Sequence, residues 1–165
     1  MALPRSPYAT AHQALALVLL LLLCLGVGWL GSTVTGPAVA TWYPTLTLPD
    51  WRPPNIAFPI VWTLLYVLMA LGAWLVWRRV PLAEARGALL LFLLQLAANL
   101  AWSFLFFGQQ SPLLGLIDIA VLVVLIVLML VAFRRIDRLA AAINLPYLAW
   151  VSFATLLNAW IYVEN

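Results

Sequence analysis

The sequence is poor in the side chains on which much cofactor and metal chemistry depends: its 165 residues include no lysine, one cysteine and one histidine. Without lysine the chain cannot form the Schiff base that would hold retinal or pyridoxal phosphate, because that bond requires an amine. The single cysteine, Cys24, excludes an intrachain disulfide. Cys24 and His12 cannot supply the ligand set of an ordinary His/Cys metal site, so we expect no metal and no required cofactor.

Charged side chains are also scarce, at 8% of the chain, whereas 67% of the residues are hydrophobic. Soluble domains are about 45–50% apolar and about one-quarter charged, so this composition indicates an integral membrane protein. The net charge of +3 comes from arginines in short segments between apolar runs. Nucleic-acid binding needs a basic face or stripe, and we expect no nucleic-acid partner. Richness in alanine, leucine and arginine without lysine is typical of a GC-rich bacterial gene, which predicts a bacterial cell membrane.

Five apolar segments reach the length of about 20 residues that a helix needs to cross a bilayer. They cover approximately residues 13–34, 57–77, 86–107, 112–133 and 139–162. We therefore expect an all-α integral membrane fold, a five-transmembrane-helix bundle that forms a single domain over residues 1–165. The first segment also has features of a secretory signal, because Arg5 precedes it and small residues follow at 38–40. Its apolar core is longer than that of most signal sequences, which favours a spanning helix.

The arginines are distributed unequally between the two ends of such a bundle. Seven of them fall on the side of the N-terminus: Arg5, Arg78, Arg79, Arg86, Arg134, Arg135 and Arg138. The opposite side has Arg52 alone. Because short cytoplasmic segments carry an excess of basic residues, we expect the N-terminus in the cytoplasm and the C-terminus outside. Trp74 and Trp77 fit an aromatic belt at the inner interface.

The connection at residues 35–56 is the one long loop that this arrangement predicts. Its five prolines favour extended or turned backbone, and Trp42, Tyr43 and Trp51 lie among them. Disordered segments tend to lack aromatic residues, so we expect the loop to be ordered. A lid over the outer mouth of the bundle is the favoured interpretation. The alternative is an interfacial segment whose tryptophans sit among lipid headgroups, and the two are compatible.

Aromatic and amide side chains recur at spacings of three and four in three of the predicted spans. The segments are Trp62-x-x-x-Tyr66, Gln95-x-x-x-Asn99-x-x-Trp102 and Trp150-x-x-x-Ala154-x-x-x-Asn158. These spacings place side chains on one helical face. Polar groups within a membrane usually face a protein interior or a cavity. Each stripe alone also fits packing or helix–helix hydrogen bonding, but together they predict an aromatic pocket with amide groups inside the bundle.

Two further features concern structure more than ligand binding. Asp118 is the one acidic residue well inside a predicted span, and an ionisable group there is a functional candidate by default. It lies near the outer end of its helix without other titratable groups, so we expect a structural polar contact rather than a proton relay. Small residues four apart, Ala97 and Ala101, permit close helix approach and predict a homodimer face; Gly28 and Ser32 have the same spacing.

Four segments carry a resemblance to a known family: WYPTLTLPDWRPP at 42–54, FPIVWTLLYVLMA at 58–70, QLAANLAWSFLFFG at 95–108 and PYLAWVSFATLLNAWIYVEN at 146–165. Through them the chain resembles the translocator proteins, also called tryptophan-rich sensory proteins or TspO/MBR. The resemblance implies a five-helix bundle, usually a homodimer, with a ligand pocket beneath the first loop. The implied pocket residues are Trp42, Tyr43, Trp62, Tyr66, Gln95, Asn99, Trp102, Trp150, Ala154 and Leu157. Asp118 and Asn158 also match family positions, and we expect them to be structural polar residues.

The resemblance also implies a function. Family members bind porphyrins such as protoporphyrin IX and haem, so we expect a receptor or sensor for tetrapyrroles, linked to porphyrin regulation and stress. Two alternatives stay open: an enzyme that degrades porphyrin under light, and a transporter of porphyrins or other lipophilic molecules. No acid–base or metal constellation is visible, which disfavours the enzyme. Many relatives also bind sterols, but the vertebrate sterol motif needs a basic residue after a tyrosine. Here Tyr162 is followed by Val163, Glu164 and Asn165, so sterol binding is not expected.

Overall fold

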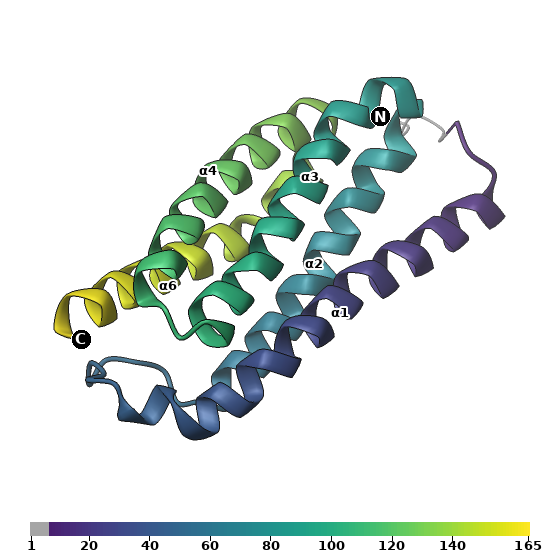
Figure 1. The fold of residues 1–165 in the computed structure, drawn as a ribbon. Coiled ribbons are helices and arrows are strands. Elements are labelled where there is room, and N and C mark those ends of the chain that lie inside the picture. The colour runs from purple at the N-terminus through teal and green to yellow at the C-terminus, as the bar shows by residue number, and fades with distance from the viewer. Residues whose placement is uncertain (1–6) are drawn as a thin grey trace.

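The computed structural model describes residues 7–165 as a bundle of helices (Figure 1). The long helices are α1 (Thr10–Thr41), α2 (Ala57–Arg79), α3 (Leu82–Ser103), α4 (Pro112–Ile136) and α6 (Leu145–Glu164). Three short elements join them: a 3-10 turn η1 (Tyr43–Thr45), a π-helical turn η2 (Phe104–Gly108) and a five-residue helix α5 (Arg138–Ala142). Five candidate membrane spans result, and no strand occurs in the described range. The expected all-α class and the number of spans are confirmed.

The two ends of the bundle differ in chemistry. The connection at 42–56 and the C-terminus lie at one end, here called the loop end (Figure 1). The turns from α2 to α3 and from α4 to α5 lie at the other end. We call it the arginine end because six arginines lie in or beside these two turns. These six are Arg78, Arg79, Arg86, Arg134, Arg135 and Arg138. Arg5, which the sequence assigns to the same side, lies outside the described residues.

The predicted end of the first helix at residue 34 was wrong by seven residues. Helix α1 continues to Thr41 with Pro37 inside it, so the long loop begins at Trp42 rather than at residue 35. Proline removes one backbone donor, which led us to expect a loop. Membrane helices tolerate proline when neighbouring groups satisfy the freed backbone atoms. In the last turn of this helix the Thr41 hydroxyl also donates to the carbonyl of Pro37 at 2.9 Å.

The predicted fifth span is interrupted near its start. Asp137 caps α5, its Oδ1 accepting from the backbone N–H groups of Leu139 at 2.8 Å and Ala140 at 3.1 Å. After a turn, Asn144 lies fully buried and donates from Nδ2 to the carbonyl of Ala140 at 2.9 Å. Pro146 then occupies the first turn of α6, where its missing N–H costs little. Local capping therefore divides one apolar run into two helices.

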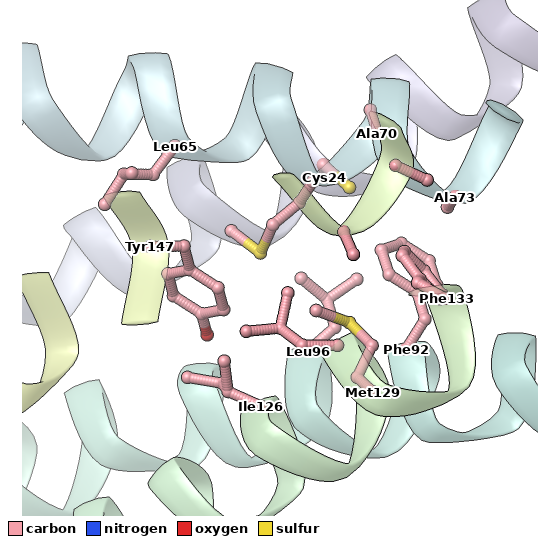
Figure 2. Close-up of a cluster of buried hydrophobic side chains, with 14 of the residues drawn as sticks. Cys24, Leu65, Ala70, Ala73, Phe92, Leu96, Ile126, Met129, Phe133 and Tyr147 are labelled. Carbon is pink, nitrogen blue, oxygen red and sulfur yellow. The ribbon is translucent and has the colours of Figure 1, made fainter. Parts of the chain in front are cut away.

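A dense apolar core fills the bundle from its middle toward the arginine end (Figure 2). Every long helix contributes to it, and Figure 2 labels Cys24, Leu65, Ala70, Ala73, Phe92, Leu96, Ile126, Met129, Phe133 and Tyr147. All ten are buried. Helix α1 is the least buried span and runs along the outside of the bundle (Figure 1). Few of its residues are therefore buried, and most of its side chains face away from the other described helices.

Aromatic contacts attach the N-terminal part of α1 at the arginine end. Tyr8 stacks on Trp77 with ring centroids 4.1 Å apart, and the Trp74 indole N–H donates to the carbonyl of Gln13 at 2.9 Å. The guanidinium of Arg78 lies 4.3 Å from the centroid of the Trp74 ring. Arg79 pairs with Asp137 at 3.7 Å. The contacts of Tyr8 and Gln13 hold the start of α1 near α2 at this end, and the other half of α1 forms a cavity wall.

Candidate ligand-binding site

A cavity of about 590 Å³ lies in the loop-end half of the bundle. Binding pockets for drug-sized molecules are typically about 300–1,000 Å³, mostly apolar, with a few placed polar groups. Eight of the ten predicted ligand-binding residues line it: Tyr43, Trp62, Tyr66, Asn99, Trp102, Trp150, Ala154 and Leu157. The three sequence stripes do converge on one space, with α2, α3 and α6 as its walls.

The other two predicted residues, Trp42 and Gln95, are not among the lining residues. Trp42 packs edge-on against Phe106 and Phe107, with centroids 5.5 and 6.4 Å apart, and both phenylalanines line the cavity. Trp42 therefore packs behind two residues of the cavity wall and does not line the cavity itself. Gln95 lies fully buried one helical turn deeper than Asn99, below the floor of the cavity. Gln95 and Asn99 share one helical face, and that face extends beyond the cavity.

A chain of buried hydrogen bonds forms the floor and joins α2, α3 and α6. The Tyr66 hydroxyl donates to Asn99 Oδ1 at 2.6 Å, and Asn99 Nδ2 donates to the Tyr147 hydroxyl at 3.1 Å. Tyr147 in turn donates to Gln95 Oε1 at 2.8 Å. Gln95 Nε2 lies 3.6 Å from the sulfur of Met69, a weak acceptor. Each amide thus has partners at both ends, which fixes the orientation of Asn99 beside the cavity.

The wall formed by α3 depends on the π-helical turn η2. Such turns inside α-helices often occur at functional sites. Here the turn brings Phe106 beneath Trp102, with nearly parallel rings 5.2 Å apart, and places Phe107 edge-on to the same indole. The Trp102 N–H donates to Asn158 Oδ1 at 3.2 Å, and Asn158 Nδ2 donates to the carbonyl of Pro112 at 2.8 Å. Asn158 therefore makes the expected contacts between helices, and it also lines the cavity.

Residues 42–56, which we call the cap, reach over the loop end of the cavity. Tyr43 and Asn55 of the cap line the cavity, and Tyr43 is buried against Phe107 with centroids 5.9 Å apart. Two hydrogen bonds attach the cap to the C-terminus: the Thr47 N–H donates to Asn165 Oδ1 at 2.8 Å, and Asn165 Nδ2 donates to the Thr47 carbonyl at 3.2 Å. The cap is thereby held against the bundle at its middle as well as at both ends.

Asp118 lies on α4 and is not among the lining residues. One of its carboxyl oxygens, Oδ2, is buried, and within residues 7–165 it has no hydrogen-bond partner. The expected polar contact to a neighbour is therefore not found for this oxygen. The indole nitrogen of Trp150 is likewise buried and has no partner among the described residues, although the Trp150 ring itself faces the cavity.

Several residues of the cavity and of the hydrogen-bonded floor beneath it were not predicted from the sequence. Tyr147 precedes Trp150 by three positions, so the same stripe could have identified it. Phe106 and Phe107 face the cavity only because of the π-helical turn, which spacing rules do not indicate. On α1, Gly28 was noted only for close helix approach. A Cβ atom there would lie 2.5 Å from the Tyr66 ring, so glycine is what allows α1 to approach α2 closely at this point of the cavity wall.

Comparison with known sequences places these observations in a family context. The sequence profile of the TspO/MBR family matches residues 20–163. A tryptophan-rich protein TspO of Chlorobaculum tepidum is 45% identical over 157 residues, covering 93% of this chain and 98% of that protein. A protein of the same name from Archaeoglobus fulgidus is 39% identical over 151 residues, with 92% and 97% covered. A tryptophan-rich sensory protein of Cereibacter sphaeroides is 38% identical over 118 residues, with 71% and 72% covered.

Proposed function

Because the chain belongs to the TspO/MBR family of multi-pass membrane proteins, we propose that it is a receptor or sensor that binds tetrapyrroles in its aromatic cavity. Protoporphyrin IX and haem are the proposed ligands, and regulation of porphyrin metabolism under stress is the proposed role. The observation that carries this proposal is the convergence of Trp62, Trp102 and Trp150 on one cavity of about 590 Å³. The name of one relative, a sensory protein, agrees with it.

The chemistry of the cavity suits a flat conjugated ligand. A macrocycle can stack on indole and phenol faces, and such aromatic contacts contribute beyond the area that they bury. Asn99 and Asn158 are two buried amides among the polar groups that line the walls. Acidic side groups of the ligand would need donors, and Arg52 is the cation at the loop end. Its Nη1 donates at 3.0 Å to Asn55, which lines the cavity, so a carboxylate at the cap could reach both.

Orientation and assembly form part of the same proposal. With six described arginines at the arginine end and Arg52 at the other, the positive-inside rule supports a cytoplasmic arginine end and an outward-facing cap. Ala97 and Ala101 lie on α3, and Ala97 is exposed. Small residues on an exposed face support the proposal that two copies pair through α3.

Tryptophan substitution tests the proposed pocket. Purified protein is titrated with protoporphyrin IX, and saturable quenching of tryptophan fluorescence is measured for wild type, Trp62→Ala and Trp150→Ala. Stacking of a planar heteroaromatic on one aromatic side chain contributes about 1–3 kcal/mol, so each variant should raise Kd by about five-fold or more. Trp77→Ala, at the arginine end beside Tyr8, is the control and should bind as wild type does. Unchanged affinity in both cavity variants would exclude this cavity as the porphyrin site.

A further inference from the structure

The cavity is sealed on three of its sides. Between α2 and α6, Phe58 packs edge-on against Trp150 at 5.8 Å, and Trp62 packs against Tyr147 at 6.3 Å. At the loop end, the cap is attached to Asn165. Toward α3, helix α1 approaches closely, because a Cβ at Gly31 would lie 3.0 Å from the hydroxyl of Ser103.

The side between α1 and α2 is different. Six lining residues on these two helices are exposed: Leu25, Trp29, Ser32, Gly36, Pro59 and Thr63. Trp29 is 69% exposed, whereas Asn99 and Phe106 on the opposite wall are 3% and 2% exposed. Residues that face both the cavity and the surroundings mark an opening. Apart from Leu25, these residues lie on the cap side of the contact of Gly28 with Tyr66, so the opening extends from that contact toward the cap.

The rim of this opening is suited to lipid rather than to water. Its two hydroxyl groups are satisfied within their own helices: Ser32 donates to the carbonyl of Trp29 at 2.6 Å, and Thr63 donates to that of Pro59 at 2.8 Å. In hydrocarbon, polar groups must find such internal partners. The rim residues also belong to two of the candidate membrane spans, Thr10–Thr45 and Ala57–Arg79. An opening at this place leads into the bilayer.

We propose that the opening between α1 and α2 is a lateral entrance through which the cavity takes its ligand directly from the membrane. The ligand class is a planar lipophilic molecule dissolved in the leaflet on the cap side, which passes edge-on between Ser32 and Gly36 on one helix and Pro59 and Thr63 on the other. This inference rests on the proposed function, because it concerns how the same cavity is filled. The cap then keeps water out and is not the route.

Two glycines on α1 provide a matched test. Gly36 lies on the rim and Gly26 lies off the cavity, and a Cβ at either position would meet no atom within 4 Å. Gly36→Phe adds a large side chain at the rim to narrow the opening, and Gly26→Phe adds the same side chain elsewhere on the helix; the Cβ atom has open space at both positions. Each protein is placed in lipid nanodiscs, mixed rapidly with nanodiscs preloaded with protoporphyrin IX, and followed by tryptophan quenching. Phenylalanine adds no indole signal.

A narrowed entrance raises the barrier in both directions. Gly36→Phe should slow association and dissociation together by about ten-fold, with little change in Kd, and Gly26→Phe should match wild type. Association and dissociation rates equal to those of wild type in Gly36→Phe would overturn the inference of a lateral entrance. A raised Kd with an unchanged association rate would overturn it as well. Asn165→Ala, which frees the cap, tests the other route: faster binding in this variant would also overturn the inference. Absence of saturable quenching in wild type would instead refute the proposed function itself.

Discussion

Replacing Tyr147 by phenylalanine removes one buried oxygen from the floor of the cavity. That oxygen accepts from Asn99 at 3.1 Å and donates to Gln95 at 2.8 Å. The ring remains and keeps its contact with Trp62. The substitution therefore separates hydrogen bonding from packing at a residue that is fully buried.

The expected magnitude follows from the two bonds that are lost. Hydrogen bonds between membrane helices contribute about 0.6 kcal/mol on average and at most about 1.7 kcal/mol, so two contribute about 1–3 kcal/mol. The lost bond leaves the buried Gln95 Oε1 without its donor, and the usual cost of about 1–3 kcal/mol for such a group is a second estimate of the same loss rather than an addition to it. We expect the free energy of unfolding of Tyr147→Phe to fall by about 1–3 kcal/mol. Tyr66→Phe removes one bond, to Asn99, and should have about half this effect.

Equilibrium unfolding of the purified protein in bicelles measures these free energies. Tyr162→Phe is the control, because Tyr162 is 44% exposed near the C-terminus, and it should unfold as wild type does. Two results would refute the reasoning. The first is a Tyr147→Phe protein that is as stable as wild type. The second is a larger loss for Tyr66→Phe than for Tyr147→Phe, since the order follows from the number of bonds that each hydroxyl makes.

Two other predictions concern the wall and the chemistry of the cavity. Gly28→Ala should lower the free energy of unfolding by about 1–3 kcal/mol, because the added Cβ would lie 2.5 Å from the Tyr66 ring. The control is Gly26→Ala, whose Cβ would meet nothing within 4 Å. It should leave the free energy of unfolding unchanged in the same measurement. For a receptor that does not degrade its ligand, illuminated protoporphyrin IX should disappear no faster with this protein than with an unrelated membrane protein of equal tryptophan content. Faster loss that vanishes when Trp62 and Trp150 become phenylalanine would instead support the enzyme alternative.

Much of the fold was predictable because the relevant signals are local. A run of about 20 apolar residues is long enough to span a bilayer whatever its neighbours are, and the number of helices followed from that rule. The stripes followed from the helical repeat, which sets the face of Trp62 and Tyr66 before any packing occurs. Composition alone showed that the protein belongs in a membrane.

The sequence did not predict the end of α1, the π-helical turn or the break before α6, because there tertiary contacts outweigh the preferences of the local sequence. Pro37 indicated a loop, yet α1 continues past it to Thr41. The π-helical turn at Phe104–Gly108 has no spacing signature, although it is what brings Phe106 and Phe107 into the wall. The break before α6 depends on Asn144, which is buried and also donates at 3.4 Å to the carbonyl of Leu68 on α2. The bond from Asn144 to Leu68 joins residues far apart in the sequence, which the sequence does not imply.

The sequence by itself determined that the chain is a five-span membrane protein and which face of each helix carries aromatic and amide groups, because both properties depend on length and periodicity. Only the tertiary structure decided where along those faces the cavity ends. Gln95 and Asn99 are one turn apart on one stripe, yet Asn99 lines the cavity and Gln95 lies beneath it with Tyr147. The physical reason is packing: the cap and α1 enclose space at the loop end, and the apolar core fills it toward the arginine end.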